Sequence, residues 1–124
     1  MSQEMTTELA QKKLHSLQLK QQHLAKQLGS IGFIWSGTIS RRLLTCGKPS
    51  CRCHTDAEAK HGPYYYWTTK KAGKTVSRSL SREQATILGQ WIDNRRELEQ
   101  VTETMKKLSQ EAYEAMLYLA EHSQ

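Results

Sequence analysis

The sequence predicts an α+β protein: a small zinc-stapled, three-stranded antiparallel β module flanked by an N-terminal helix and a long C-terminal helix. Three observations predict it: heptad patterns at both ends, strand-like alternation between them, and a compact cluster of Cys and His. Only 37% of the 124 residues are hydrophobic, so a core must be small and needs a staple or a partner. The expected parts are residues 1–29, 30–80 and 81–124.

The N-terminal part is expected to be a helix that carries one apolar seam. Alanine, leucine and one glutamine recur at alternating spacings of four and three from Ala10 to Leu28. This is the pattern of a heptad seam. Gly29 follows directly, as glycine commonly does after the last turn of a helix, so the helix is expected to end at about Leu28.

The middle part, residues 30–80, is expected to form the sheet. It holds both prolines, all three cysteines and most of the glycines. A glycine-containing turn over 70–74 predicts a hairpin, and we expect three antiparallel strands in all. Strand-like patterns occur at Ile31, Phe33 and Trp35, over 37–44, over 64–69 and over 75–80.

The last part is expected to be one long helix. Ser81 and Gln84 have the spacing of a capping box. An uninterrupted seam then runs from Ile87 to Leu119, along a helix of about 55–60 Å at ~1.5 Å per residue. Such a seam is too long to be buried on the β module alone, so another helix must cover it.

The partner of this helix is open at the level of sequence. The first helix of the same chain, a helix of a second chain, or both would cover the seam as a coiled coil or helical bundle. Gln21 and Asn94 are polar seam positions, and a buried Asn is a known device for fixing register and oligomeric state. We expect a homodimer or a higher oligomer through the helices.

A metal site is indicated by three thiols and two imidazoles between positions 46 and 61. Tetrahedral zinc takes four N or S ligands from short loops, and glycine and proline in the first spacer suit the turn that such a loop makes. Three clustered cysteines in a reducing compartment favour a metal over a disulfide. The expected ligands are Cys46, Cys51, Cys53 and His61, with His54 as the substitute for His61.

The zinc is expected to be structural, and the protein is not expected to be an enzyme. A catalytic zinc keeps one position open and needs a nearby acid or base. Asp56 and Glu58 are the only carboxylates near in sequence, and neither belongs to an HExxH motif or to the deaminase HxE and PCxxC motifs. A hydrolytic or redox enzyme remains an alternative that would require an activated thiol or an open zinc position.

The positive charge of the chain is concentrated in the β module. Residues 36–80 hold nine Lys and Arg against two Asp and Glu, a net charge of +7, whereas the whole chain has +6. Basic residues interleaved with aromatic residues favour nucleic-acid binding, with DNA ahead of RNA. The expected contacts are Arg41, Arg42, Lys48, Arg52, Lys60, Lys70, Lys71, Lys74, Arg78 and Tyr65.

The aromatic residues of the module have a second interpretation as its small core. Because side chains alternate along a strand, one face buries either Tyr64 and Tyr66 or Tyr65 and Trp67. The sequence leaves this choice open.

No window approaches the roughly 20 apolar residues of a membrane helix, and the N-terminal residues do not resemble a signal peptide. The expected location is therefore the cytoplasm, without a membrane partner.

The motifs CGKPSCRC at 46–53 and HGPYY at 61–65 resemble those of a family of small bacterial proteins encoded beside transposases and other mobile elements. The resemblance covers about Gly29 to Met116. It implies a mobile-element or defence context, favours DNA binding, and places His61 rather than His54 at the motif position. A looser fold-level likeness is to the arm-binding domains of tyrosine integrases, which present a three-stranded sheet to a major groove.

Together these observations predict a non-enzymatic, zinc-containing nucleic-acid-binding accessory or regulatory protein. The alternative is an adaptor that binds a larger recombinase, transposase or effector enzyme through its helices and aromatic hairpin. The chain itself carries no recombinase catalytic set, so it would assist such an enzyme.

Overall fold

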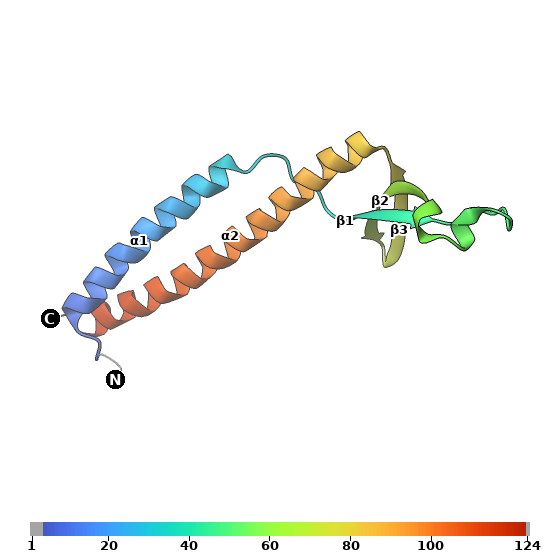
Figure 1. The fold of residues 1–124 in the computed structure, drawn as a ribbon. Coiled ribbons are helices and arrows are strands. Elements are labelled where there is room, and N and C mark those ends of the chain that lie inside the picture. Colours follow the sequence, from blue (N-terminus) through green and yellow to red (C-terminus); the bar gives the residue numbers. More distant parts are fainter. Residues whose placement is uncertain (1–3, 124) are drawn as a thin grey trace. The chain divides into compact units, whose positions relative to one another are not determined.

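A computed structural model describes residues 4–123, and its elements confirm the predicted α+β class (Figure 1). The ends of the predicted first and third parts, residues 1–3 and 124, lie outside the described residues. In chain order the elements are α1 (Thr7–Ser30), β1 (Thr38–Leu44), short 3-10 helices at Arg52–His54 and Ala57–Ala59, β2 (His61–Lys71), β3 (Lys74–Leu80) and α2 (Arg82–Glu121).

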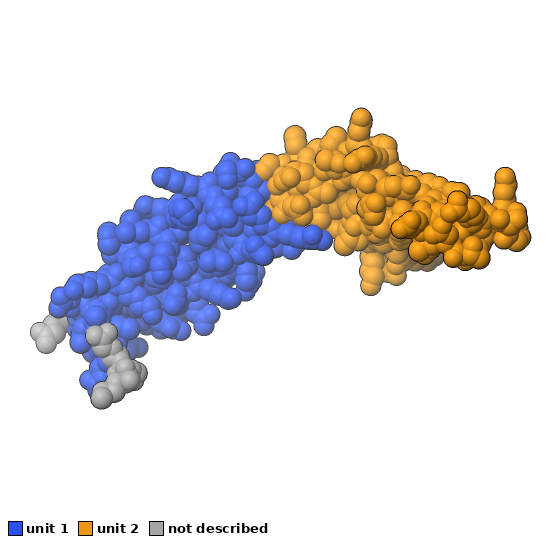
Figure 2. Space-filling model, viewed as in Figure 1, with its two compact units in different colours: residues 1–31, 96–124 blue, residues 32–95 orange. Residues whose placement is uncertain are grey.

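The chain packs as two compact units, which Figure 2 shows in different colours. One unit combines the residues up to Ile31 with those from Arg96 onward, and the other is Gly32–Arg95. Helix α2 belongs to both units. The three parts expected from the sequence are consecutive stretches of the chain. The first unit, in contrast, combines residues from both ends of the chain, because α1 packs on the C-terminal part of α2.

The first unit is an antiparallel helix pair formed within one chain. Ala10 and Leu17 of α1 and Val101 and Ala115 of α2 are its buried residues, and all four are predicted seam positions. Polar contacts join the helices along their length: the Gln27 amide donates to the Glu97 carboxylate (3.1 Å), Lys13 pairs with Glu111 (4.0 Å), and the Tyr118 hydroxyl donates to the Met5 carbonyl (2.8 Å). The seams therefore meet intramolecularly.

The helix ends follow local rules. The Thr6 hydroxyl accepts from the Leu9 amide (3.1 Å) at the start of α1. At the start of α2 the Gln84 amide donates to the Ser81 hydroxyl (3.1 Å), and the Ser81 amide donates to the Gln84 side chain (2.9 Å), which confirms the capping box. In the described part of the chain, no helix has both the length and the apolar character that crossing a membrane requires.

Residues 32–37, in the segment between α1 and β1, are irregular, so the strand-like alternation there does not produce a strand. Its backbone groups bond to α2 instead of a neighbouring strand. The Trp35 amide donates to the Trp91 carbonyl (3.1 Å), Asn94 donates to the Phe33 carbonyl (2.8 Å), and Arg95 Nε donates to the Trp35 carbonyl (2.9 Å). Asn94, predicted as a polar seam position, thus holds this segment, which we call the linker.

The sheet has the order β1-β2-β3 with antiparallel pairing throughout, as predicted. The β2–β3 turn is Ala72-Gly73, and both residues have positive φ (52° and 78°), as a two-residue type I′ hairpin requires. The β1–β2 register shifts between Arg42 and Leu44, where β1 leaves the regular ladder and the chain enters the cysteine loop.

The register divides the sheet into two different faces, because directly opposed residues lie on the same face. We call one the packed face, since it holds all the aliphatic residues and the tryptophan of the regular ladder; it carries Ile39, Arg41, Tyr65, Trp67, Thr69, Lys71, Lys74, Val76, Arg78 and Leu80. We call the other the hydroxyl face; it carries Thr38, Ser40, Arg42, Tyr64, Tyr66, Thr68, Lys70, Thr75, Ser77 and Ser79.

The linker lies against the packed face. The ring centroids of Trp67 and Trp35 lie 5.8 Å apart, and the Trp67 indole N–H donates to the Ser36 carbonyl (2.8 Å). Of the two alternations that the sequence left open, the structure therefore packs the face of Tyr65 and Trp67.

Candidate metal centre and basic surface

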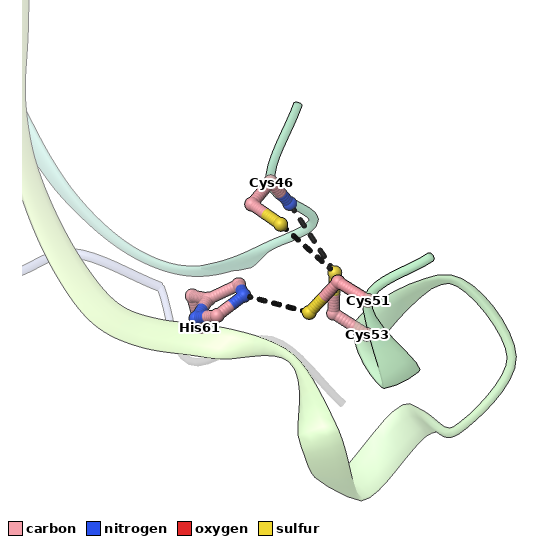
Figure 3. A group of neighbouring side chains, drawn as sticks. All are labelled: Cys46, Cys51, Cys53 and His61. Atoms are coloured by element: carbon pink, nitrogen blue, oxygen red, sulfur yellow. Dashed lines mark hydrogen bonds between the residues drawn. The ribbon is translucent and has the colours of Figure 1, made fainter. Parts of the chain in front are cut away.

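The predicted ligand set comes together at one point beside the sheet. Cys46, Cys51 and Cys53 lie on the loop between β1 and β2, and His61 is the first residue of β2 (Figure 3). Their ligand atoms all lie within 4.8 Å of one another. These four residues, which we call the Cys3His cluster, can hold a metal ion.

Local turns bring the three sulfurs to this point. The Cys51 amide donates to the Lys48 carbonyl (3.1 Å), which closes a turn around Pro49. The first 3-10 helix follows at once and buries Cys53, which is 2% exposed. Asp56 caps the second 3-10 helix by accepting from the Glu58 amide (3.0 Å), and the chain then re-enters the sheet.

The spacing of the donor atoms suits a tetrahedral ion. Bonds of about 2.0–2.3 Å to a tetrahedral zinc place neighbouring ligand atoms roughly 3.3–3.8 Å apart. Cys51 Sγ lies 3.4 Å from His61 Nε2, and Cys46 Sγ lies 3.7 Å from Cys53 Sγ. The backbone amide of Cys46 also donates to Cys53 Sγ (3.3 Å), a contact that orients the sulfur and stabilises its charge.

The electrostatics of the cluster favour one thiolate in particular. Hydrogen bonding from the backbone amide of Cys53, followed by contacts with His61 and the other two cysteines, lowers the pKa of Cys51 to about 6. Burial raises the pKa of the Cys53 thiol. Since metals bind the thiolate, Cys51 offers a ready anionic ligand at neutral pH.

The second histidine of the motif is directed elsewhere. His54 Nε2 lies 2.9 Å from the Lys48 carbonyl oxygen, and His54 is not part of the cluster. Of the two histidines that the sequence offered, the structure therefore places His61, and not His54, beside the three sulfurs. Asp56, one of the nearby carboxylates, pairs with Arg52 (2.9 Å).

The predicted nucleic-acid contacts divide among three places. All nine of the basic residues are exposed, whereas Tyr65 is half-buried. Among the described residues, only Arg52 of this set forms an ion pair with a carboxylate, that of Asp56. Arg41, Tyr65, Lys71, Lys74 and Arg78 lie on the packed face, Arg42 and Lys70 on the hydroxyl face, and Lys48, Arg52 and Lys60 in the loop.

Sequence reasoning missed the surroundings of Arg42. Its guanidinium carbon lies 4.7 Å from the centroid of the Tyr66 ring, and its Nε donates to the Ser40 hydroxyl (3.2 Å). Alternation along each strand could place Arg42 and Ser40 on one face. It could not place Tyr66 of β2 beside them, because that contact depends on the register between the strands.

Comparison with known proteins gives a family. The family model of the domain of unknown function DUF6788 matches residues 12–89, more than half of the chain. The chain belongs to the DUF6788 family. The DUF6788 match includes the linker, the whole sheet and the Cys3His cluster, and it ends within α2. No curated protein and no solved structure matches the chain.

Proposed function

We propose that the chain is a non-enzymatic module that binds nucleic acid, with DNA preferred to RNA, and that a structural zinc ion holds the module together. The observation that carries the proposal is the concentration of exposed, mostly unpaired basic residues on a sheet and loop built around the Cys3His cluster. Such a surface neutralises backbone phosphates and releases their counterions.

The identity of the ion is argued from the ligands. Three thiolates and one imidazole at tetrahedral spacing are a typical set for zinc, and four protein ligands make a closed, structural site. The sheet also needs such a staple, because none of the described residues of β1, β2 or β3 is fully buried. Binding energy of the metal would replace the core that the module lacks.

Native mass spectrometry tests the zinc directly. We expect one zinc ion per chain and, after removal by a chelator, loss of the near-ultraviolet circular dichroism from Trp35 and Trp67, whose packing depends on the sheet. A chain purified without metal, or one whose spectrum is unchanged by the chelator, would contradict a structural zinc.

Charge reversal tests the nucleic-acid interface. Replacing Lys70, Lys71 and Lys74 by Glu should weaken binding to all sequences alike and flatten its salt dependence, because phosphate contacts carry no sequence information. The control reverses three exposed lysines on the helices, which changes the net charge equally; these are Lys20, Lys106 and Lys107. Equal loss in both variants, or no loss in either, would remove the hairpin from the interface.

The biological setting is proposed from the motif resemblance stated above. An accessory or regulatory protein of a bacterial mobile element or defence system would bring DNA to a larger recombinase or transposase. The three cysteines are free thiols, which suits a metal site maintained in the reducing cytoplasm.

A second candidate, an adaptor that binds a partner protein, is favoured by exposed apolar side chains. Phe33 is 74% exposed on the linker, and Tyr113 and Met116 are 62% and 56% exposed on α2. A homodimer formed through the helices would likewise bury exposed apolar side chains of α2. Gel shift at moderate salt separates DNA binding from the adaptor role, and light scattering after gel filtration gives the oligomeric state.

A further inference from the structure

The hydroxyl face is chemically uniform. Every side chain that the regular ladder places there carries a hydroxyl group or a positive charge, and none is a carboxylate or an aliphatic group. A hydroxyl both donates and accepts, so it can bind phosphate oxygens and either kind of base edge. This composition fits a polyanion that also presents donors and acceptors.

Arg42 is held in place on this face. Its guanidinium carbon lies over the Tyr66 ring, and its Nε donates to the Ser40 hydroxyl. The two terminal amino groups of a guanidinium are the ones that bind guanine or phosphate in bidentate fashion. Ordering of the side chain before binding lowers the entropy that binding costs.

The packed face is covered around Trp67 and Leu80, although its basic residues are exposed. Trp35 and Ser36 of the linker lie against Trp67, and Arg95 of α2 holds the linker there through the carbonyl of Trp35. Leu80 at the end of β3 lines a pocket with Trp91 of α2. A large ligand therefore meets the sheet from the hydroxyl side.

The width of the hydroxyl face can be compared with the grooves of duplex DNA and duplex RNA. Three strands span two spacings of about 4.8 Å, so the backbone of the sheet is roughly 10 Å wide, while the major groove of B-form DNA is about 12 Å wide. The major groove of duplex RNA is too narrow for side chains to read. A single strand would bind by stacking on several open aromatic rings, but Arg42 already covers one side of Tyr66, and Tyr64 (44% exposed) is the other ring of this face.

From this chemistry and width we infer that the hydroxyl face enters the major groove of duplex DNA, with Arg42 and Lys70 as its cationic contacts. The inference rests on the proposed function and adds to it the face, the groove and the duplex form. Arg41 and Lys71, on the packed face, are then peripheral to the contact.

The test compares two double variants that remove equal charge from the same two strands. Arg42→Ala with Lys70→Ala changes the hydroxyl face, and Arg41→Ala with Lys71→Ala changes the packed face. Binding to a labelled 20-base-pair duplex is followed by fluorescence anisotropy over a salt series. The first variant should bind at least about tenfold more weakly, with the salt slope reduced by about 0.9 per lost phosphate contact, and the second should change by less than about threefold.

Each other outcome has a defined meaning. Equal or greater weakening by the packed-face variant would overturn the choice of face while leaving nucleic-acid binding intact. Tighter binding to a single strand or to duplex RNA of the same sequence would overturn the major groove. If the unaltered zinc-loaded chain binds no nucleic acid at low salt, the proposed function itself fails, and the inference fails with it.

Because Arg42→Ala also removes the contacts of Arg42 with Tyr66 and Ser40, a second pair of variants leaves Arg42 unchanged. Ser77→Glu places a carboxylate on the hydroxyl face, where the Ser77 hydroxyl makes only a long contact with Thr68 (3.5 Å), and Ser36→Glu places one on the linker beside Trp67. With metal content and circular dichroism unchanged, Ser77→Glu should weaken DNA binding at least about tenfold and Ser36→Glu by less than about threefold. Equal effects would overturn the inference.

Discussion

At the scale of single residues, the Cys3His cluster shows what spacing predicts and what it leaves open. Three cysteines around glycine and proline predicted a metal loop, and the structure brings all three sulfurs together. The choice between His54 and His61 did not follow from spacing. It depends on a contact across the loop, since His54 lies against the Lys48 carbonyl while β2 carries His61 to the sulfurs.

Substitution of the two histidines tests the ligand assignment. His61→Ala should lower zinc affinity by more than the roughly 10–100-fold that loss of a ligand's hydrogen-bond partner costs, because a ligand itself is removed. His54→Ala is the matched control and should change zinc affinity by less than about tenfold. Competition with a chromogenic zinc chelator measures both; the reverse order of effects would show that His54 is the ligand.

At the scale of elements, the predictions that hold depend on neighbours in sequence. The capping box and the two-residue hairpin are set by residues three or fewer apart, and both occur as expected. The alternation of Ile31, Phe33 and Trp35 resembles that of a strand, but the linker forms none, because its carbonyl groups bond to side chains of α2, about 60 residues away. Contacts at that separation leave no local signal.

Helix α2 offers an element-scale prediction at Gly89, where a Cβ would meet nothing within 4 Å. Gly89→Ala should raise the free energy of unfolding by about 0.5–1 kcal/mol, because alanine loses less backbone entropy in a helix. Ser81→Ala, which removes the cap, should lower it by about 1 kcal/mol. Urea unfolding followed by circular dichroism at 222 nm measures both; a destabilising Gly89→Ala would show that α2 does not accept a side chain there.

At the scale of the whole molecule, composition predicted a small core that needs a staple or a partner, and the charge distribution placed the basic residues in the β module. The buried residues of the described chain lie in the helices, with Cys53 as the one in the loop, and none lies in the sheet. The sequence could not say which face of the sheet is packed, because alternation fits both. Register and the linker decide it, and only then does the hydroxyl face emerge as a continuous polar surface.

The central claim is that a metal-held sheet presents this basic surface to DNA. The most direct measurement is the affinity of zinc-loaded and zinc-stripped protein for one labelled duplex at several salt concentrations. The account predicts tight, strongly salt-dependent binding by the zinc-loaded chain and at least about tenfold weaker binding after the metal is removed. Equal affinity of the two forms, or no binding by the zinc-loaded form at low salt, would contradict it.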